Sequence, residues 1–300
     1  MPQVGAAHRQ KSTGAHSVRA IGGMMIGQAR IATQRLERTM TGQRWAETPM
    51  FMLRRDCVSR AISSWPPGRF LEVGAGTGAL TQTFLARGFT GVCYDLGDAN
   101  RQVLRRNLAG FGAAVEVVDS LTTLEPGTFD YVVAFEVLEH IAADAEALRS
   151  WARYLKLGGR IIVSVPAHMH KFNEEDRAVG HHRRYERRQL QQLFETAGCT
   201  DTRIRSYGFP LAVLTRRGNQ VLTRLASSRK SAGEQPTPES LSIRSGVERS
   251  DVSLRLSRIL TRRTLAPFIV LQRAFFGTDL GDGYVAEALY RPRSRPFGAS

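Results

Sequence analysis

A glycine-rich turn at residues 74–78 constrains the fold more than any other part of the chain. Its residues are Gly74, Ala75, Gly76, Thr77 and Gly78. Glycine lets the backbone adopt positive φ angles and approach a ligand closely, where a Cβ atom would collide. The largely apolar residues 69–73 predict a short buried strand before the turn, and residues 79–87 predict a helix after it. A strand, a glycine turn and a helix in this order are typical of the first unit of a nucleotide-binding α/β domain.

Acidic residues stand beside this turn and at the ends of the strands that follow it. Asp95 comes about twenty residues after the turn, where a carboxylate can accept hydrogen bonds from both hydroxyls of a ribose. Asp119 ends the next strand and can accept a hydrogen bond from an adenine amino group. Glu72 precedes the turn, and Glu136 follows a buried strand. This many carboxylates would repel a pyrophosphate and would suit a positively charged ligand.

With these residues in place, residues 45–210 resemble the class I S-adenosylmethionine-dependent methyltransferases. The resemblance rests on the glycine turn, on Asp95 and Asp119, and on the run Glu-Val-Leu-Glu-His-Ile at 136–141. It implies S-adenosyl-L-methionine as the cofactor and S-adenosyl-L-homocysteine as the product. It also implies a Rossmann-like, doubly wound α/β fold whose seven-stranded sheet is mostly parallel with an antiparallel last strand, and a helical insertion before that strand.

The resemblance also assigns cofactor-binding roles. The turn would hold the methionine part, Asp95 the ribose and Asp119 the adenine, while Glu72 would orient the turn directly or through water. On a helix that we predict over 45–64, Arg55 would pair with the cofactor carboxylate, and a solvated arginine is the alternative. The predicted set is Arg55, Glu72, Gly74, Ala75, Gly76, Thr77, Gly78, Asp95, Leu96, Asp119, Ser120, Phe135, Glu136 and Val137.

A long loop at 166–185 follows the fifth predicted strand, at the end of the sheet where substrates bind in such folds. Its run Asp-Arg-Ala-Val-Gly-His-His-Arg-Arg-Tyr at 176–185 resembles a signature of a bacterial methyltransferase subgroup whose members modify glycans, lipid-linked sugars or natural products. We therefore expect substrate-binding side chains here. They are His168, His181, Arg183, Arg184 and Tyr185. The competing interpretation is structural: Asp176 would pair with Arg183 or Arg184 and fold the loop.

Methyl transfer to an O–H or N–H group needs a base that removes the proton. Imidazole can accept a proton near neutral pH, which makes His140, His168 and His181 candidates. The predicted catalytic set is His140, His181 and Glu136. The spacing of the histidines and acids matches no strong zinc pattern, so we expect no metal.

The chain divides by charge and by predicted elements. We expect a basic, partly disordered N-terminal arm at 1–44, the cofactor-binding core at 45–210, a basic helical insertion at 211–283 that serves as a lid or substrate element, and the last strand with a tail at 284–300. Strands are predicted at 69–73, 91–95, 114–118, 129–135, 160–165, 202–208 and 284–290. We interpret Leu157-Gly158-Gly159 as the end of a helix.

The net charge of +15 lies mainly outside the predicted core. The leading interpretation is an enzyme that acts on a small-molecule, glycan, lipid-linked or peptide acceptor. The basic segments leave open two alternatives, an RNA methyltransferase and a membrane-associated cofactor-binding module without catalysis. A nucleic-acid partner is disfavoured, since the core shows no platform of aromatic and basic residues on which bases could stack. An NAD-dependent oxidoreductase is a weaker alternative. Three scattered cysteines and no apolar run of about 20 residues favour a cytoplasmic protein, with contact to an anionic membrane through the basic segments left open.

Overall fold

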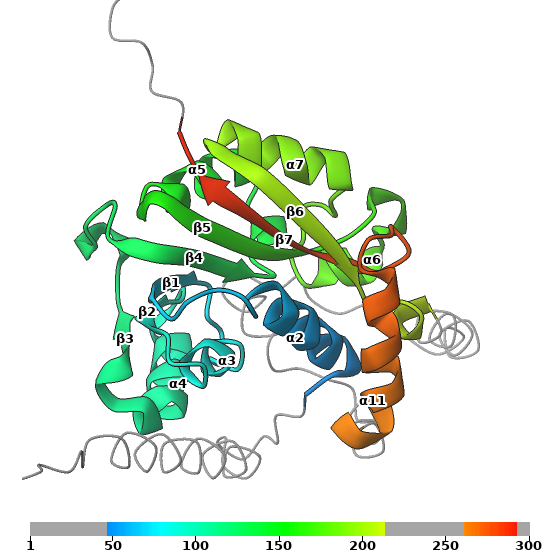
Figure 1. The fold of residues 1–300 in the computed structure, drawn as a ribbon, viewed down its shortest axis with the longest axis horizontal. Helices are drawn as coiled ribbons and strands as arrows, with labels where there is room; N and C mark the ends of the chain where they lie inside the picture. The colour runs from blue at the N-terminus through cyan, green and yellow to red at the C-terminus, as the bar shows by residue number, and fades with distance from the viewer. Residues whose placement is uncertain (1–46, 214–260, 293–300) are drawn as a thin grey trace, which may run out of the picture. The chain divides into compact units, whose positions relative to one another are not determined.

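The computed structural model describes residues 47–213 and 261–292 (Figure 1). The predicted N-terminal arm and most of the predicted insertion lie outside these residues. Within the described ranges, no helix has the length and apolar character needed to cross a membrane.

One seven-stranded sheet forms the centre of the described chain (Figure 1). The strands are β1 (Arg69–Val73), β2 (Thr90–Tyr94), β3 (Val115–Val118), β4 (Phe129–Phe135), β5 (Leu155–Pro166), β6 (Cys199–Tyr207) and β7 (Gly283–Tyr290). Their spatial order is β3-β2-β1-β4-β5-β7-β6. Strands β1 to β5 pair in parallel, whereas β7 runs antiparallel to both β5 and β6. The predicted sheet with its antiparallel last strand is confirmed.

Helices cover both faces of the sheet, as expected of a doubly wound fold (Figure 1). One face carries α2 (Pro49–Ala61), α3 (Thr81–Leu85), α4 (Asp98–Leu108) and α11 (Arg262–Leu271). The other face carries α5 (Asp144–Ala152) and α7 (Arg187–Thr196). The short helix α6 (Glu174–Ala178) lies in the loop after β5. Short 3₁₀ segments are η1 (Ala109–Ala114), η2 (Leu121–Thr123), η3 (Leu138–His140), η4 (Met169–Lys171) and η6 (Gln272–Phe275).

The two apolar layers follow from the alternation of side chains along the strands. In β1, Phe70 packs into the layer under α2 and α3, while Leu71 packs into the layer under α5 and α7. Both are fully buried. Because each central strand is covered on both faces, its sequence reads as a nearly continuous apolar run.

The segment Leu157-Gly158-Gly159 is not the end of a helix, contrary to our prediction. Helix α5 already ends at Ala152, and β5 begins at Leu155. The pairing of β4 with β5 shifts its register within this stretch, where Gly158 has a φ of +78°. A Cβ on Gly159 would lie 2.9 Å from the Lys156 carbonyl oxygen. These glycines therefore allow the backbone of β5 to adopt the irregular conformation that accompanies the register shift.

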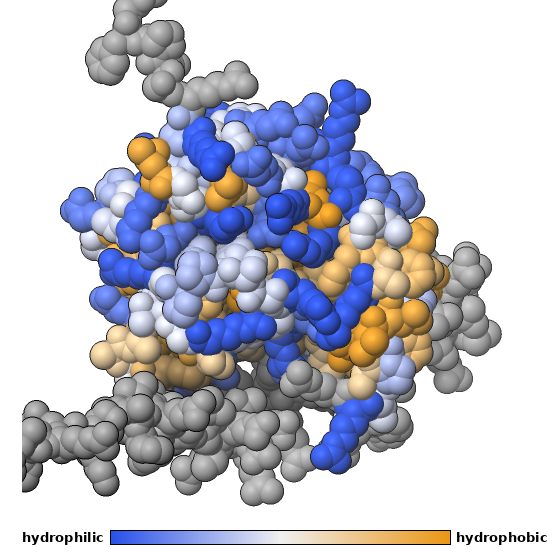
Figure 2. All heavy atoms as spheres, in the orientation of Figure 1, coloured by the Kyte–Doolittle hydropathy of each residue, from blue (hydrophilic) through white to orange (hydrophobic). Residues whose placement is uncertain are grey.

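The described end of the insertion packs beside α2 (Figure 1). The Gln272 side chain donates to the Leu53 carbonyl at 3.0 Å, and Arg273 forms an ion pair with Asp56 at 2.6 Å. Figure 2 shows apolar residues gathered on the surface over α11, next to hydrophilic side chains. Two residues there, Val270 and Leu271, are among the exposed large apolar side chains. The lid role that we predicted for the insertion stays a prediction.

We expect Leu190→Ala to lower the free energy of unfolding by about 2–5 kcal/mol, because Leu190 of α7 is fully buried against the sheet. The matched control is Leu157→Ala, whose side chain is 82% exposed; we expect a change within about 0.5 kcal/mol. Chemical denaturation of both variants measures the difference. Equal effects of the two substitutions would contradict the assigned packing of α7.

Candidate active site

The glycine turn is held against the ends of two neighbouring strands. The backbone N–H groups of Gly74 and Ala75 both donate to the Tyr94 carbonyl at the end of β2, at 2.8 and 3.1 Å. A Cβ on Gly74 would lie 2.4 Å from Cγ2 of Val137, which follows β4. By contrast, no atom lies within 4 Å of the position that a Cβ on Gly76 would take. The turn is therefore crowded at its base and open at its centre, where its positive φ favours glycine.

Asp95 lies directly beside this open centre. Its Oδ2 accepts a hydrogen bond from the Gly76 N–H at 2.6 Å, and its Oδ1 accepts from the Asn100 side chain at 2.9 Å. The residue is 6% exposed. The next residue, Leu96, exposes 64% of its surface. A carboxylate and an accessible apolar side chain thus adjoin one another at the end of β2.

Asp119 and Ser120 follow β3. Oδ1 of Asp119 pairs with Arg105 and, at 3.2 Å, with Arg101. The hydrogen bond and charge of Arg105 hold the pKa of this exposed carboxyl below its usual range. Ser120 Oγ accepts from the Thr122 N–H at 3.2 Å and so caps η2. The contact of Asp119 with adenine stays a prediction. In such a contact, the adenine amino group would share the Asp119 carboxylate with Arg101 and Arg105.

Glu72 lies behind the turn. It is 2% exposed, and its Oε2 accepts a hydrogen bond from the Thr81 hydroxyl at 2.5 Å. This bond links β1 to the first residue of α3, the helix that follows the turn. Burial raises the pKa of Glu72 to about 8, although the Thr81 hydroxyl opposes the shift. The contact supports the predicted orienting role of Glu72 by way of α3.

Glu136, the first residue after β4, has a positive φ of 56°. Its Oε1 accepts hydrogen bonds from Ser164 at 2.9 Å and Tyr207 at 3.1 Å, and lies 3.2 Å from Nη1 of Arg54. Burial by itself would raise the pKa of this carboxyl. The positive charge of Arg54, together with the hydrogen bonds, holds it below its usual range.

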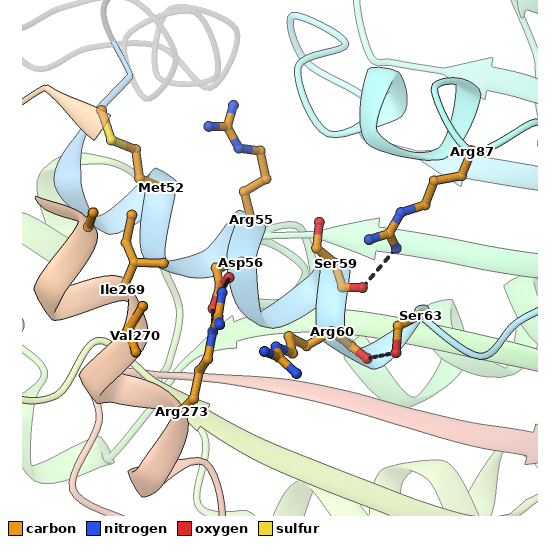
Figure 3. Close-up of a pocket in the computed structure, with 11 residues that line it drawn as sticks. Met52, Arg55, Asp56, Ser59, Arg60, Ser63, Arg87, Ile269, Val270 and Arg273 are labelled. Atoms are coloured by element: carbon orange, nitrogen blue, oxygen red, sulfur yellow. Dashed lines mark hydrogen bonds and ion pairs between the residues drawn. The ribbon is translucent and has the colours of Figure 1, made fainter. Parts of the chain in front are cut away.

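Arg54, and not Arg55, is therefore the α2 arginine that reaches the end of β4. Arg55 pairs with Glu47 and lines a separate cavity of about 520 Å³ (Figure 3). The cavity lies between α2 and α11 and also includes Arg60, Arg87 and Arg273 among its lining residues. Consecutive helix residues point about 100° apart, so only one of the pair can face the sheet. The geometry does not favour the predicted role of Arg55 at the cofactor.

A buried ion pair folds the loop after β5. Both carboxylate oxygens of Asp176 accept from the Arg184 guanidinium at 2.8 Å. Asp176 also closes a capping box with Asn173 at the start of α6. Tyr185 is fully buried and donates to Asp144 at 2.9 Å. The structural alternative for this loop, in which Asp176 pairs with Arg184, is confirmed.

These contacts correct two predicted substrate contacts. Arg184 is 8% exposed and saturated by Asp176, and Tyr185 has no exposed surface, so neither side chain can also reach a ligand. Arg183 pairs with Asp144 at 2.8 Å and donates to the Ala142 carbonyl. Its contact with a substrate stays a prediction.

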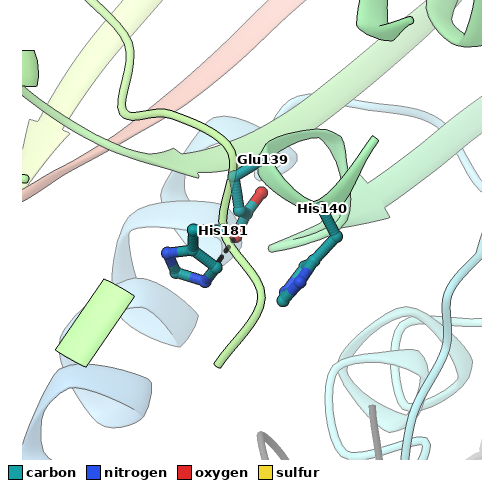
Figure 4. A group of neighbouring side chains, drawn as sticks. All are labelled: Glu139, His140 and His181. Atoms are coloured by element: carbon teal, nitrogen blue, oxygen red, sulfur yellow. Dashed lines mark ion pairs between the residues drawn. The ribbon is translucent and has the colours of Figure 1, made fainter. Parts of the chain in front are cut away.

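The loop brings His181 to the residues that follow β4, where it meets Glu139 and His140 (Figure 4). His181 Nδ1 lies 3.1 Å from Oδ1 of Asp176, and its Nε2 lies 3.9 Å from Oε1 of Glu139. The rings of His140 and His181 meet edge to face, with centroids 4.7 Å apart. Burial, reinforced by the neighbouring His181, lowers the pKa of His140 to about 4. His140 is consequently neutral at pH 7.

Glu139 was not predicted as a site residue, although the run at 136–141 contains it. It has no exposed surface. Burial and the nearby negative charge of Glu136 raise its pKa well above the usual range. Its own backbone N–H is a neighbouring donor, but within the described residues no hydrogen bond of normal geometry reaches either carboxylate oxygen. The sequence did contain a signal for Glu139, because a second carboxylate three residues after Glu136 lies close to it when the segment forms a helical turn.

His168 lies outside this cluster. Its Nδ1 is 3.5 Å from Glu186, and its ring neighbours His170 and Tyr284. His168, His170 and Glu186 form a second group of neighbouring polar atoms, two of whose members are exposed. The structure therefore does not bring His168 together with His140 and His181.

The fold, the turn and the acids at the strand ends agree with the family to which the chain belongs. The chain is a member of the methyltransferase-domain family, whose model matches residues 44–204. It is accordingly a class I S-adenosylmethionine-dependent methyltransferase in fold and in cofactor class.

Part of the chain is also similar to individual curated relatives. A ubiquinone biosynthesis O-methyltransferase of Nitrosomonas europaea is 31% identical over 116 residues, which cover 37% of this chain and 49% of the relative. A protein of the same name from Alkalilimnicola ehrlichii is 34% identical over 118 residues, covering 37% and 47%. The matches thus span about half the length of these relatives.

Among solved structures, a chain in the complex of the Haloferax volcanii Trm112 methyltransferase activator with a putative methyltransferase is similar to this one. The TM-score is 0.51 at 15% identity, covering 82% of this chain and 93% of that one. This likeness concerns the fold alone.

We expect the wild type to lose stability relative to Glu72→Gln as the pH rises from about 4.3, the ordinary pKa of glutamate, toward 8. The folded protein holds the Glu72 proton more tightly than the unfolded chain does, so this contribution is complete at low pH and is lost as the pH rises. The slope is at most about 1.4 kcal/mol per pH unit. Urea denaturation at pH 5 and pH 8 measures it.

The control for this experiment is Glu125→Gln at an exposed position. Because the Glu125 side chain is solvent-exposed, this substitution should change stability by no more than about 0.5 kcal/mol at either pH. A pH-independent difference for Glu72→Gln as well would contradict the assigned burial of Glu72.

Proposed function

We propose that this protein transfers the methyl group of S-adenosylmethionine to a hydroxyl oxygen of a small molecule. The observation that carries the proposal is the cluster of Glu139, His140 and His181 next to the cofactor turn. Val137 of the same segment packs on Gly74, so the cluster and the turn belong to neighbouring parts of one strand edge. Family membership supports the cofactor, and the geometry of the cluster supports the removal of a proton.

The residues at the turn fit the cofactor. The space above Gly76 leaves room for a ligand at the strand end, and the adjacent carboxylate of Asp95 suits a ribose diol. The exposed side chain of Leu96 offers an apolar surface to an adenine ring. When bound, S-adenosylmethionine supplies a methyl carbon on a positively charged sulfur, which the acceptor oxygen attacks in line. The carboxylate of Glu136 provides negative charge at this edge.

The protein must then position the acceptor and take up its proton. His140 is neutral at pH 7, and the Asp176 carboxylate orients the ring of His181. In neutral imidazole one ring nitrogen is an acceptor, so this cluster can hold a hydroxyl group and promote loss of its proton. The new O–CH₃ bond forms as the C–S bond breaks, and the sulfur leaves as a neutral thioether. The partial similarity to ubiquinone biosynthesis O-methyltransferases favours oxygen over nitrogen as the acceptor atom.

The proposed chemistry is not restricted to one acceptor compound. A glycan, lipid-linked or peptide acceptor that carries a hydroxyl fits the same chemistry, as the resemblance at 176–185 implies. The cavity between α2 and α11 collects several arginines and lies next to exposed apolar residues of α11. This surface supports the prediction of contact with an anionic membrane or acidic partner.

We expect Asp95→Asn to weaken binding of S-adenosylhomocysteine by about 10- to 100-fold, because it removes the charge from hydrogen bonds to the ribose. The matched control is Asp98→Asn, an exposed residue of α4, for which binding should be unchanged. Isothermal titration calorimetry measures both, with NAD as the competing ligand. Preference for NAD, or equal loss in the two variants, would refute the cofactor assignment.

The acceptor is identified by incubating small-molecule extracts with the protein and deuteromethyl-labelled cofactor, followed by mass spectrometry. We expect a product that carries the label on oxygen and whose formation is lost in His181→Gln. Labelling that is confined to RNA would support the nucleic-acid alternative and contradict a small-molecule acceptor.

A further inference from the structure

The geometry points to a divalent metal ion bound by Glu139, His140 and His181, a site that the sequence analysis did not expect. One carboxylate oxygen and two imidazole nitrogens from these residues all lie within 4.8 Å of one another. Glu139 and His140 come from η3 after β4, whereas His181 comes from the loop after α6 (Figure 4). Folding therefore assembles three metal-ligand types from two separate segments.

The Glu139 carboxylate is poorly compensated within the described residues, where its ion-pair contact with His181 Nε2 is as long as 3.9 Å. The side chain has no exposed surface, and within residues 47–213 and 261–292 neither of its oxygens accepts a hydrogen bond of normal geometry. A buried ionised carboxylate that accepts no hydrogen bond is costly, and such groups normally gain a close partner or coordinate a metal. A cation between Glu139 and the two histidines would meet this need.

The distance between Glu139 and His181 also fits a shared ion. Oε1 of Glu139 and Nε2 of His181 are 3.9 Å apart, beyond the range of a hydrogen bond. Carboxylate oxygens and imidazole nitrogens bind Zn²⁺ at about 2.0–2.2 Å. Two atoms at this separation can consequently both contact one ion that lies between them.

A second layer of hydrogen bonds orients the imidazole of His181. Asp176 is the acceptor for His181 Nδ1, and its own position is fixed by Arg184 and by the backbone of Asn173. Since Nδ1 then carries the proton, Nε2 presents its lone pair toward Glu139. A carboxylate behind a ligating histidine, as Asp176 lies behind His181, is the arrangement usual at metal sites.

The ligand types indicate the class of metal. Two imidazoles suit first-row divalent ions, and two histidines with one glutamate form a set that catalytic Zn²⁺ sites use. We therefore expect Zn²⁺ or Mn²⁺. Three protein ligands leave coordination positions open to another molecule.

An open position gives the metal a role in the proposed methyl transfer, and this part of the inference rests on that proposed function. An acceptor hydroxyl oxygen bound to the ion would lose its proton more readily, because a divalent cation lowers the pKa of a bound O–H group. With both imidazoles bound to the ion, the proton passes to water and not to a histidine. The oxygen, then negatively charged, forms the bond to the methyl carbon as the carbon–sulfur bond breaks.

The test is metal binding by untagged, full-length protein that has been treated with a chelator and desalted. Titration with ZnCl₂ and separately with MnCl₂, followed by calorimetry, should show one equivalent bound by the wild type. Glu139→Gln and His181→Gln should each weaken this binding at least 100-fold, since each removes a direct ligand. The matched control is His182→Gln, an exposed neighbour on the same loop, which should bind as the wild type does.

The group of His168, His170 and Glu186, two of whose members are exposed, is a competing site, so His170→Gln is tested in parallel. Loss of binding in His170→Gln with retention in Glu139→Gln would overturn the inference. Folding is checked by thermal denaturation in chelator, where Glu139→Gln should melt no lower than the wild type because it removes a buried carboxyl group that accepts no hydrogen bond of normal geometry. Added metal should raise the melting temperature of the wild type and leave that of Glu139→Gln unchanged.

The inference and the proposed function fail in different ways. Methyl transfer that continues undiminished in excess chelator, with no metal bound by the wild type, would refute the metal and leave the methyltransferase intact. Metal binding that depends on Glu139 and His181, without any methylated product, would support the metal site and refute the proposed reaction. Binding of S-adenosylhomocysteine by Glu139→Gln should stay within about twofold of wild type, which separates the metal site from the cofactor turn.

Discussion

The half-buried carboxylate of Glu136 connects four elements of the fold. It accepts hydrogen bonds from Ser164 of β5 and Tyr207 of β6, and it pairs with Arg54 of α2 at the point where β4 ends. The ion pair is partly shielded from water, with 18% of the Arg54 side chain and 28% of the Glu136 side chain exposed, so loss of one partner would leave the other charge poorly compensated. The position of this strand end, and of everything that follows it, depends on these contacts.

At this strand end, the pKa values of two glutamates three residues apart are shifted in opposite directions. Arg54 and two hydroxyl groups outweigh burial and hold the pKa of Glu136 below its usual range, whereas burial next to Glu136 raises the pKa of Glu139 well above it. Neighbouring carboxyl groups whose environments separate their pKa values are typical of functional sites. Here Glu136 supplies fixed negative charge near the glycine turn, and Glu139 lies beside His140 and His181 without a hydrogen bond of normal geometry among the described residues. The chemistry of the site follows from this difference.

Much of the fold could be predicted because its signals are local. Glycines that need positive φ marked the turn at 74–78, and continuous apolar runs marked strands buried on both faces. The failures came where the partner of a residue lies far away in the sequence. The choice of Arg54 over Arg55 depends on the rotation of α2 against the sheet, and the burial of Arg184 depends on Asp176 across a loop. Leu157-Gly158-Gly159 has the glycines of a helix end, and the strand irregularity that they serve could not be predicted because it depends on pairing with β4.

By itself, the sequence determined the class of fold, the cofactor turn and the carboxylate at Asp95, since each of these depends on residues adjacent in the chain. Only the tertiary structure decided which polar residues meet. The loop after β5 folds around the ion pair of Asp176 with Arg184 and thereby carries His181 to Glu139, about forty residues earlier in the sequence. Spacing along the chain cannot show this meeting, because the path of the loop depends on packing and charge pairing. The same folding leaves the Glu139 carboxylate without a hydrogen-bond partner among the described residues, which is the physical reason to expect a cation there.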